Sequence, residues 1–221
     1  MSKAYFITGT DTGVGKTWAS VALMRYFQNK GKSAIGMKPV AAGCEWLDGQ
    51  LKNEDALLMQ QHASVDLDYN EINPFAYEEA VSPHLAADDR HPVQLDGIVQ
   101  AFNQIKNKSD VIVVEGAGGW FAPLNHEQDI ADLAVALKIP VILVVAIRLG
   151  CINHARLTFQ AVQAANVECA GWIAMCVDPD MQKQAENIAT IKNKLTIPLL
   201  GALPYMDVVD FDHLAENIIR E

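Results

Sequence analysis

The sequence feature that most constrains the fold is a glycine-bearing turn at residues 9–17. The turn reads Gly-Thr-Asp-Thr-Gly-Val-Gly-Lys-Thr, follows the apolar run Ala4–Ile7 and precedes the helical run Trp18–Phe27. A strand, a glycine-bearing turn, Gly-Lys-Thr and a helix, in that order, are the context of a phosphate-binding P-loop. The stretch therefore predicts a nucleotide site at the junction between a first strand and a first helix.

The residue types in this turn suit the binding of phosphate. Glycines let backbone N–H groups curl around an anion without clashes from Cβ atoms. The first turn of the helix adds unpaired donors at the positive end of the helix dipole. Lys16 places a mobile positive charge near β- and γ-phosphate oxygens, and the Thr17 hydroxyl is placed to bind Mg²⁺.

The spacing of the turn departs from the usual P-loop pattern. That pattern has four residues between the first glycine and Gly-Lys, whereas five residues separate Gly9 from Gly15 here. Thr10 stands where the first glycine is usual. An ordinary strand–turn–helix with a surface lysine is the alternative, and the strand before and the helix after favour the nucleotide site.

Composition and charge narrow the class of protein. The chain has 221 residues, half of them apolar and a fifth charged, which is typical of one large globular domain or two small ones. A net charge of −10 argues against nucleic acid as a partner, because its phosphates need a basic face. The four cysteines, Cys44, Cys151, Cys169 and Cys176, have no Cys-x-x-Cys or zinc-finger spacing. We expect reduced thiols in a cytoplasmic protein.

Targeting and membrane signals are not expected. An apolar strand pattern begins almost at once after Met1, which argues against a signal peptide. The longest apolar run, Val141–Ile147, is far shorter than the ~20 residues that cross a bilayer. We therefore expect no membrane partner.

Short apolar runs alternate with longer amphipathic ones along the whole chain. The expected strands are Ala4–Thr8, Ser33–Met37, Val111–Glu115, Val141–Ile147, Gly171–Val177 and Leu199–Leu203. The expected helices are Lys16–Asn29, Glu54–His62, Leu95–Asn107, Ile130–Leu137, Asn153–Ala165, Met181–Leu195 and Asp212–Ile219. Strands that are apolar throughout are buried on both faces. The pattern predicts one α/β domain over residues 1–221, with a single doubly wound, mostly parallel sheet, helices on both faces and a P-loop NTPase-like fold.

Ligands of such sheets gather at the carboxyl ends of the strands, so polar residues that follow apolar runs are candidates for the site. Glu115 ends the run 111–114 like the acid of a Walker B strand, which holds Mg²⁺ opposite the P-loop threonine. Its alternative role is a helix N-cap. Lys38 follows the second strand beside Pro39, where a second cation would help transfer of a phosphoryl group; a solvated lysine is the alternative.

Other positions carry weaker signals. Asn53 resembles an N-cap, which explains Asp55 structurally and leaves a metal role open. Residues 64–94 have little regular pattern, and His84 within them contacts substrate or is merely structural. Gly150 permits a tight turn before a helix whose N–H groups suit a carboxylate, and Cys151 is expected to be buried rather than nucleophilic. Loops after the last strands, at Met175 and at residues 204–206, are candidates for holding a base.

Several stretches, taken together, resemble the dethiobiotin synthetase family of biotin biosynthesis. They are Gly9–Thr17, Lys38–Val40, Asn53–Ala56, Ser82–His84, Val114–Trp120 and Leu149–Ala155, and they occur in family order over most of the chain. The lengthened P-loop of the family accounts for Thr10. The resemblance implies an ATP-dependent cyclo-ligase that acts on 7,8-diaminononanoate, CO₂ and MgATP. A carbamate and a carbamic–phosphoric anhydride lead to dethiobiotin, ADP and phosphate.

The resemblance also implies roles for particular residues. Lys38, Lys16 and Thr12 are expected to be catalytic, and Mg²⁺ is expected between Thr17, Asp55 and Glu115. The expected nucleotide contacts are Gly13, Val14, Gly15, Lys16, Thr17, Trp18, Asp55, Glu115, Gly116, Ala117, Gly118, Met175, Cys176, Pro204, Tyr205 and Met206. The expected substrate contacts are Thr12, Lys38, Ala42, Gly118, Gly150, Cys151, Ile152 and Asn153. The range 150–153 comes from the neighbouring subunit of a homodimer.

Two positions depart from the family pattern. Family members often have a serine near the substrate where this chain has Ala42, so one hydrogen bond of ~1 kcal/mol net is in doubt. Many members read Asn-Asp where this chain reads Met175-Cys176, and the asparagine amide recognises adenine in them. The alternative function is a partitioning-type P-loop ATPase switch that binds protein partners. Such proteins usually have a second lysine early in the P-loop, where Thr10 and Asp11 stand here.

Overall fold

The computed structural model describes residues 2–88 and 91–218, and a six-stranded sheet lies at its centre. The strands are β1 (Lys3–Gly9), β2 (Ala34–Met37), β7 (Val111–Glu115), β8 (Val141–Ala146), β9 (Cys169–Met175) and β10 (Leu199–Leu203). Their order is β10-β9-β8-β1-β7-β2, and every one of these neighbours pairs in parallel.

Helices connect the strands and cover the sheet. They are α1 (Lys16–Asn29), α2 (Glu54–Gln61), α5 (Leu95–Ile105), α6 (Ile130–Leu137), α7 (Cys151–Ala164), α8 (Gln184–Lys194) and α9 (Phe211–Glu216). Short elements also occur in the connections, namely β3 (Val40–Ala41), β4 (Glu45–Leu47), β5 (Gln50–Lys52), α3 (Tyr69–Ile72), β6 (Phe75–Ala76) and α4 (Pro83–Ala86). No described helix has the length and apolar character needed to cross a membrane.

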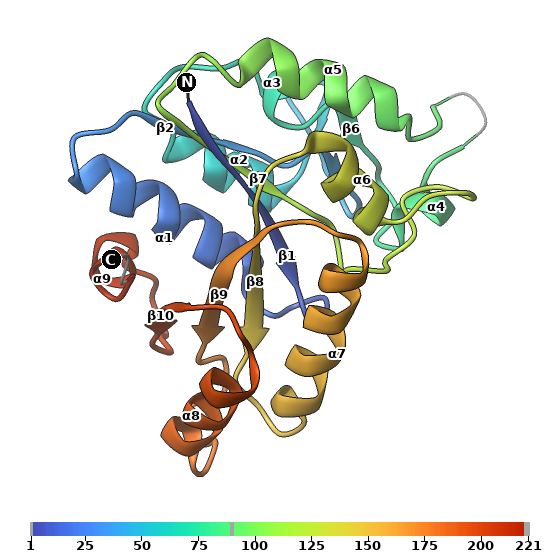
Figure 1. The fold of residues 1–221 in the computed structure, drawn as a ribbon. Coiled ribbons are helices and arrows are strands. Elements are labelled where there is room, and N and C mark those ends of the chain that lie inside the picture. Colours follow the sequence, from blue (N-terminus) through green and yellow to red (C-terminus); the bar gives the residue numbers. More distant parts are fainter. Residues whose placement is uncertain (1, 89–90, 219–221) are drawn as a thin grey trace.

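The strands are buried on both faces because helices pack on each side (Figure 1). Successive residues of a strand point to opposite faces, so Val113 belongs to the core under α1 and α9, whereas Ile112 and Val114 belong to the core under α5 and α6. Further along the sheet, Trp172 packs in a third cluster with residues of α7 and α8. The predicted doubly wound sheet is thereby confirmed.

Differences from the sequence prediction concern the ends of elements. β9 begins at Cys169 rather than Gly171 and ends at Met175, because its pairing with β8 starts at Val141↔Cys169. α7 begins directly after Gly150, whose φ of 92° turns the chain, rather than near Asn153. The predicted helix 212–219 begins at Phe211 and ends at Glu216, and its last residue, Ile219, lies outside the described residues.

The topology brings distant parts of the chain to one edge of the sheet. From β1 the chain runs out to β2, returns to β7 between them, and then crosses to β8 on the other side of β1. The carboxyl ends of β1, β2 and β7 are therefore adjacent, and in parallel α/β sheets this edge is where ligands bind.

Candidate functional site

The P-loop prediction corresponds to the turn between β1 and α1. Gly15 precedes the first residue of α1 in a left-handed conformation, with φ of 85°. This backbone angle favours glycine, and a Cβ atom at this position would also lie 2.9 Å from the methyl carbon Cε of Met175, so the methionine side chain would have to shift. The turn thus presents backbone N–H groups at the start of α1, as an anion site needs.

Lys16 is the first residue of α1 and is only 6% exposed. Its ammonium donates a hydrogen bond to the backbone oxygen of Asp11 across the turn, at 2.9 Å. Burial, reinforced by the nearby positive charge of Lys38, lowers the pKa of Lys16 to about 8. A buried cation short of negative partners is suited to an incoming phosphate, which would supply the missing charge.

Glu115 ends β7 and is the centre of the polar cluster. Its side chain is buried, and its Oε1 accepts hydrogen bonds from the Thr17 hydroxyl at 3.0 Å and from the Lys38 ammonium at 2.6 Å. The Ser20 hydroxyl donates to the other oxygen, Oε2, at 3.0 Å. The pairing of the Walker-B-like acid with the P-loop threonine, expected from the sequence, is present.

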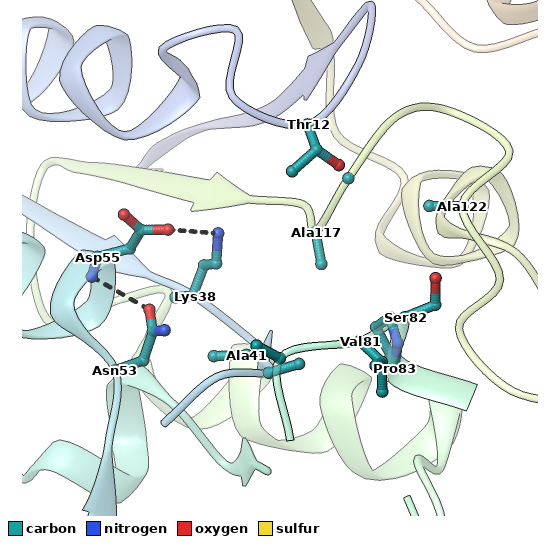
Figure 2. A pocket seen from close by; sticks show the side chains of 13 residues that line it. Thr12, Lys38, Ala41, Asn53, Asp55, Val81, Ser82, Pro83, Ala117 and Ala122 are labelled. Atoms are coloured by element: carbon teal, nitrogen blue, oxygen red, sulfur yellow. Dashed lines mark hydrogen bonds and ion pairs between the residues drawn. The ribbon is translucent and has the colours of Figure 1, made fainter. Parts of the chain in front are cut away.

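Lys38 follows β2 and joins this cluster to α2. Its ammonium lies 2.6 Å from Glu115 Oε1. It also lies 3.1 Å from Asp55 Oδ2 (Figure 2). The Asn53 side chain accepts from the Asp55 backbone N–H at 3.1 Å, which confirms the predicted N-cap and fixes the start of α2. Burial opposes the charged form of Lys38, but Glu115 and Asp55 outweigh it and raise its pKa; burial likewise opposes ionisation of Asp55, and Lys38 lowers the pKa of that carboxyl.

The oxygens of Thr17, Asp55 and Glu115 suit a hard cation. No described group of three or more His, Cys, Asp and Glu residues forms a metal cluster. Mg²⁺ in nucleotide enzymes is usually held by one or two carboxylates together with substrate phosphates. The two carboxylates carry two negative charges and the Lys38 ammonium carries one positive charge. The remaining negative charge fits a magnesium ion brought with a nucleotide.

Two cavities meet at this cluster. The first has a volume of about 330 Å³ and is lined by Thr12, Gly13, Gly15, Lys16, Thr17, Trp18, Lys38, Asp55, Glu115 and Gly118. The second has a volume of about 440 Å³ and is lined by Thr12, Lys38, Ala41, Ala42, Asn53, Asp55, Ala80, Val81, Ser82, Pro83, Ala117, Gly118 and Ala122. Thr12, Lys38, Asp55 and Gly118 line both cavities, so ligands in the two cavities would share these four residues.

The second cavity is mostly apolar beyond this junction. Figure 2 shows Lys38 and Asp55 on one side and Ser82, Val81 and Pro83 on another, with Thr12 between the two regions. The Ser82 segment belongs to the stretch 64–94 that has little sequence pattern. It reaches the site because Gly43 and Cys44 hydrogen-bond through their N–H groups to Glu79 and Tyr77.

Other predicted contacts lie outside both cavities in this single chain. Residues 150–153 begin α7 and line neither described cavity; Cys151 is buried there, as expected. Met175, at the end of β9, is 2% exposed and its methyl lies against Gly15. Cys176 and residues 204–206 follow β9 and β10 without lining either described cavity. Their proposed contacts with substrate and base stay predictions.

Sequence reasoning missed several contributors to the site. Ser20 lies three residues after Thr17, so both side chains are on one face of α1, and that spacing is the signal that was available. Val81 also lines the second cavity; it directly precedes the family-like stretch Ser82–His84, and that position is the signal that was available. Arg148, after β8, forms an ion pair with Asp11 of the P-loop at 3.0 Å, which no sequence pattern predicts.

Comparison with known proteins gives a family and a fold. A family model described as an AAA domain matches residues 3–212. A protein of Xanthomonas axonopodis pv. citri named ATP-dependent dethiobiotin synthetase BioD is 47% identical over 208 residues, which cover 94% of this chain and 93% of that protein.

Among solved structures, the MinC:MinD cell division complex of Aquifex aeolicus has a chain with a TM-score of 0.60 and 18% identity, covering 98% of this chain and 87% of the other. The septum site-determining protein MinD of Pyrococcus horikoshii, complexed with Mg-ADP, has a TM-score of 0.53 and 14% identity, covering 92% of this chain and 82% of the other. At these identities the likeness shows the fold, that of P-loop NTPases.

Proposed function

This chain belongs to the family of ATP-dependent dethiobiotin synthetases, ligases that form carbon–nitrogen bonds, and from that premise we propose its reaction. The proposed substrates are 7,8-diaminononanoate, CO₂ and MgATP, and the proposed products are dethiobiotin, ADP and phosphate. The observation that carries the proposal is the junction, at Lys38, of a P-loop cavity and a second cavity that has an apolar wall beyond this junction.

The proposed chemistry has three steps. One amine of the substrate adds to CO₂ and loses a proton, which gives a carbamate. A carbamate oxygen attacks the γ-phosphorus of ATP and expels ADP, which gives a carbamic–phosphoric anhydride. The second amine then attacks the carbonyl carbon and expels phosphate, which closes the ureido ring.

Charge repulsion is the main obstacle to the second step, because a carbamate and a γ-phosphate are both anions. The proposal assigns the γ-phosphate to Lys16 and to the N–H groups that open α1, and the carbamate to Lys38 and Thr12. Lys38 and Thr12 line both cavities, which supports this division. Fixed positive groups aimed at developing charge, together with alignment of the reacting atoms, are the largest sources of rate enhancement in phosphoryl transfer.

Magnesium is part of the proposal. Thr17, Asp55 and Glu115 would hold it, as argued from their oxygen donors and their proximity to Lys38. When bound with ATP, the ion neutralises phosphate charge. The Mg-ADP in the MinD structure from Pyrococcus horikoshii, which has the same fold, supports this assignment.

The second cavity suits the rest of the substrate. Ala41, Ala42, Val81 and Pro83 offer an apolar wall for an alkyl chain. The proposal gives the distal carboxylate of that chain to the N–H groups of residues 150–153 of a second copy in a homodimer. It also places the protein in the cytoplasm, with no nucleic acid or membrane partner.

One assay tests the proposed function. Purified protein is incubated with MgATP, diaminononanoate and bicarbonate, and both phosphate release and dethiobiotin are measured. We expect phosphate release to require the amine and bicarbonate together, in a one-to-one ratio with dethiobiotin. Phosphate release that is independent of both would contradict the proposal and favour an ATPase switch of the same fold.

A further inference from the structure

Ser20 is a buried polar residue of α1 for which neither the P-loop pattern nor the proposed reaction gives a role. Its side chain is 0% exposed, one turn after Thr17. Its hydroxyl donates a hydrogen bond to Glu115 Oε2 at 3.0 Å, across 95 residues of sequence. A hydroxyl buried at this depth needs a partner, and the partner here is the acid at the end of β7.

The two oxygens of Glu115 have different neighbours. Oε1 accepts from Thr17 at 3.0 Å and from Lys38 at 2.6 Å, on the side of the P-loop cavity. Among the side chains that the structure describes, Ser20 is the donor to Oε2. The last side-chain torsion of glutamate has a broad energy minimum. Contacts to only one carboxylate oxygen therefore leave the plane of the carboxylate weakly fixed. Ser20 supplies the contact on the opposite side.

A local structural role does not account for this contact. Serine and threonine inside helices often bond to the carbonyl of residue i−4, as Thr190 does with Glu186 in α8, at 2.7 Å. Ser20 instead points its hydroxyl to another element and to a charged acceptor. Hydrogen bonds to charged groups are the stronger class, and groups behind ligands of a metal orient those ligands.

We propose that Ser20 is a positioning residue that fixes the Glu115 carboxylate with Oε1 facing the cation site. This inference deepens the proposed function, because it concerns the same magnesium-nucleotide site. Ser20 touches neither nucleotide nor substrate in this proposal. It acts through Glu115, so its loss affects the part of nucleotide binding that depends on magnesium.

The test measures the affinity for ADP by calorimetry with and without MgCl₂. The ratio of the two affinities gives the tightening of ADP binding that is due to magnesium. We expect Ser20→Ala to reduce this ratio roughly tenfold, the lower end of the effect of losing a group behind a metal ligand. Affinity for ADP without magnesium should stay within about twofold, since the P-loop contacts remain.

Ser109→Ala is the matched control. Ser109 is also buried, and its hydroxyl bonds to the Val111 backbone oxygen at 2.7 Å, at the opposite end of β7. The control loses a buried hydroxyl just before the start of the same strand and should keep the wild-type ratio. If Ser20→Ala keeps the wild-type ratio, or if both variants lose it equally, the positioning role is wrong.

Two further variants guard the inference. Ser20→Cys keeps a weak hydrogen-bond donor of similar size, so its ratio should lie between those of wild type and Ser20→Ala. If Ser20→Ala does not fold, the Ser20→Cys ratio alone should still be lower than that of wild type. In a Glu115→Gln background, Ser20→Ala should have no further effect on the ratio, because Ser20 acts through that carboxylate. Independent, additive effects would overturn the proposal. Since ADP binding needs no diaminononanoate, this result is separable from that of the ligase assay.

Discussion

At the scale of single residues, the site depends on one buried carboxylate that holds three hydrogen-bond donors. Glu115 is 1% exposed and accepts from Thr17, Ser20 and Lys38. Replacement by Gln keeps the shape but removes the charge that offsets Lys38 and would attract a cation. We expect Glu115→Gln to fold and to lose at least about a hundredfold in turnover at saturating Mg²⁺.

Circular dichroism and the ligase assay check this expectation. Glu168→Gln is the matched control, because Glu168 is exposed just before β9, at the other edge of the sheet. Near-normal turnover of Glu115→Gln would remove this residue from the magnesium site.

The role proposed for Lys38 is one that a generic nucleotide site does not require. We expect Lys16 and the backbone N–H groups to suffice for binding ATP, whereas Lys38 lies at the junction with the second cavity. Its charge is expected to matter more in the transition state than in the ground state. We predict that Lys38→Gln binds a non-hydrolysable ATP analogue within about tenfold of wild type, but loses on the order of a hundredfold or more in turnover.

Calorimetry beside the phosphate-release assay separates these two effects. Lys32→Gln serves as control, because Lys32 is an exposed lysine just before the start of β2, whereas Lys38 follows the end of that strand. Unaltered turnover in Lys38→Gln would argue against the carbamate mechanism itself, whereas loss of ATP affinity alone would make Lys38 a phosphate ligand.

At the scale of elements, apolar side chains pack between α1 and the ends of β9 and β10, which lie across β1 from β2 and Lys38. Trp18, Val177 and Met206 are partly buried against the same core cluster as Met175. These side chains cannot pair with the edge of a base as an amide does. Apolar sites discriminate less sharply than sites that form hydrogen bonds.

We therefore predict broad use of nucleoside triphosphates. Rates with ATP, CTP, GTP and UTP at equal concentration should differ by less than about tenfold, and Met175→Asn should widen the preference for ATP. The ligase assay run with each nucleotide measures both. Strict dependence of the wild-type protein on ATP would count against this prediction.

The contact between His62, the C-cap of α2, and Phe211 of α9 gives the fold a dependence on pH. The His62 ring packs edge-on against Phe211 at 4.8 Å between ring centroids. Burial, together with the positive charge of Arg25, lowers the pKa of His62 below its ordinary value of 6.5. As the pH falls through about 6.5 toward the lower pKa of the folded chain, the unfolded chain binds more protons than the folded chain. The free energy of unfolding therefore decreases.

We predict that lowering the pH from about 7.5 to about 5.5 reduces the Tm of His62→Gln less than it reduces the Tm of wild type. Because the ring is partly exposed, the difference in the loss of Tm should be small, about 1–2 °C. His213→Gln on α9 is the control, since His213 is an exposed imidazole near the same interface. Identical pH dependence in wild type and His62→Gln would contradict the role of His62.

The sequence predicted the regular elements better than the connections. The six strands of the sheet have apolar runs long enough to be recognised, and Glu115 and Lys38 were found because they follow such runs. The hairpin β4–β5 was missed although Asp48-Gly49, with φ of 54° and 79°, is a typical hairpin turn. Strands of two residues such as β3 and β6 leave no periodicity to detect.

Long-range partners were the hardest part to predict. Spacing within α1 places Ser20 beside Thr17, but only the folded chain shows that both face Glu115. The ion pair between Arg148 and Asp11 likewise depends on β8 lying next to β1, which follows from the sheet order. Such contacts join residues 95 to 137 positions apart, where local propensity carries no information.

At the scale of the whole molecule, the single chain leaves part of the proposed site unexplained. Residues 150–153 are expected to receive the substrate carboxylate, yet they line neither described cavity of their own chain. Leu149, immediately before them, is 96% exposed, an unusual position for a large apolar side chain in a turn. Contact with a second copy would cover it and would bring residues 150–153 to the cavity of that copy.

We therefore predict a homodimer whose ligase activity depends on assembly. Light scattering should give twice the chain mass, and Leu149→Asp should shift the protein toward monomer and lower turnover at least about tenfold, because a buried unpaired charge opposes association. Val208→Asp is the control, since Val208 is 83% exposed in the loop after β10 rather than in the turn before α7. If turnover per chain rises with protein concentration for Leu149→Asp but is constant for the control, the dimer is the active unit. A wild-type monomer that is fully active at the assay concentration would disprove the shared site.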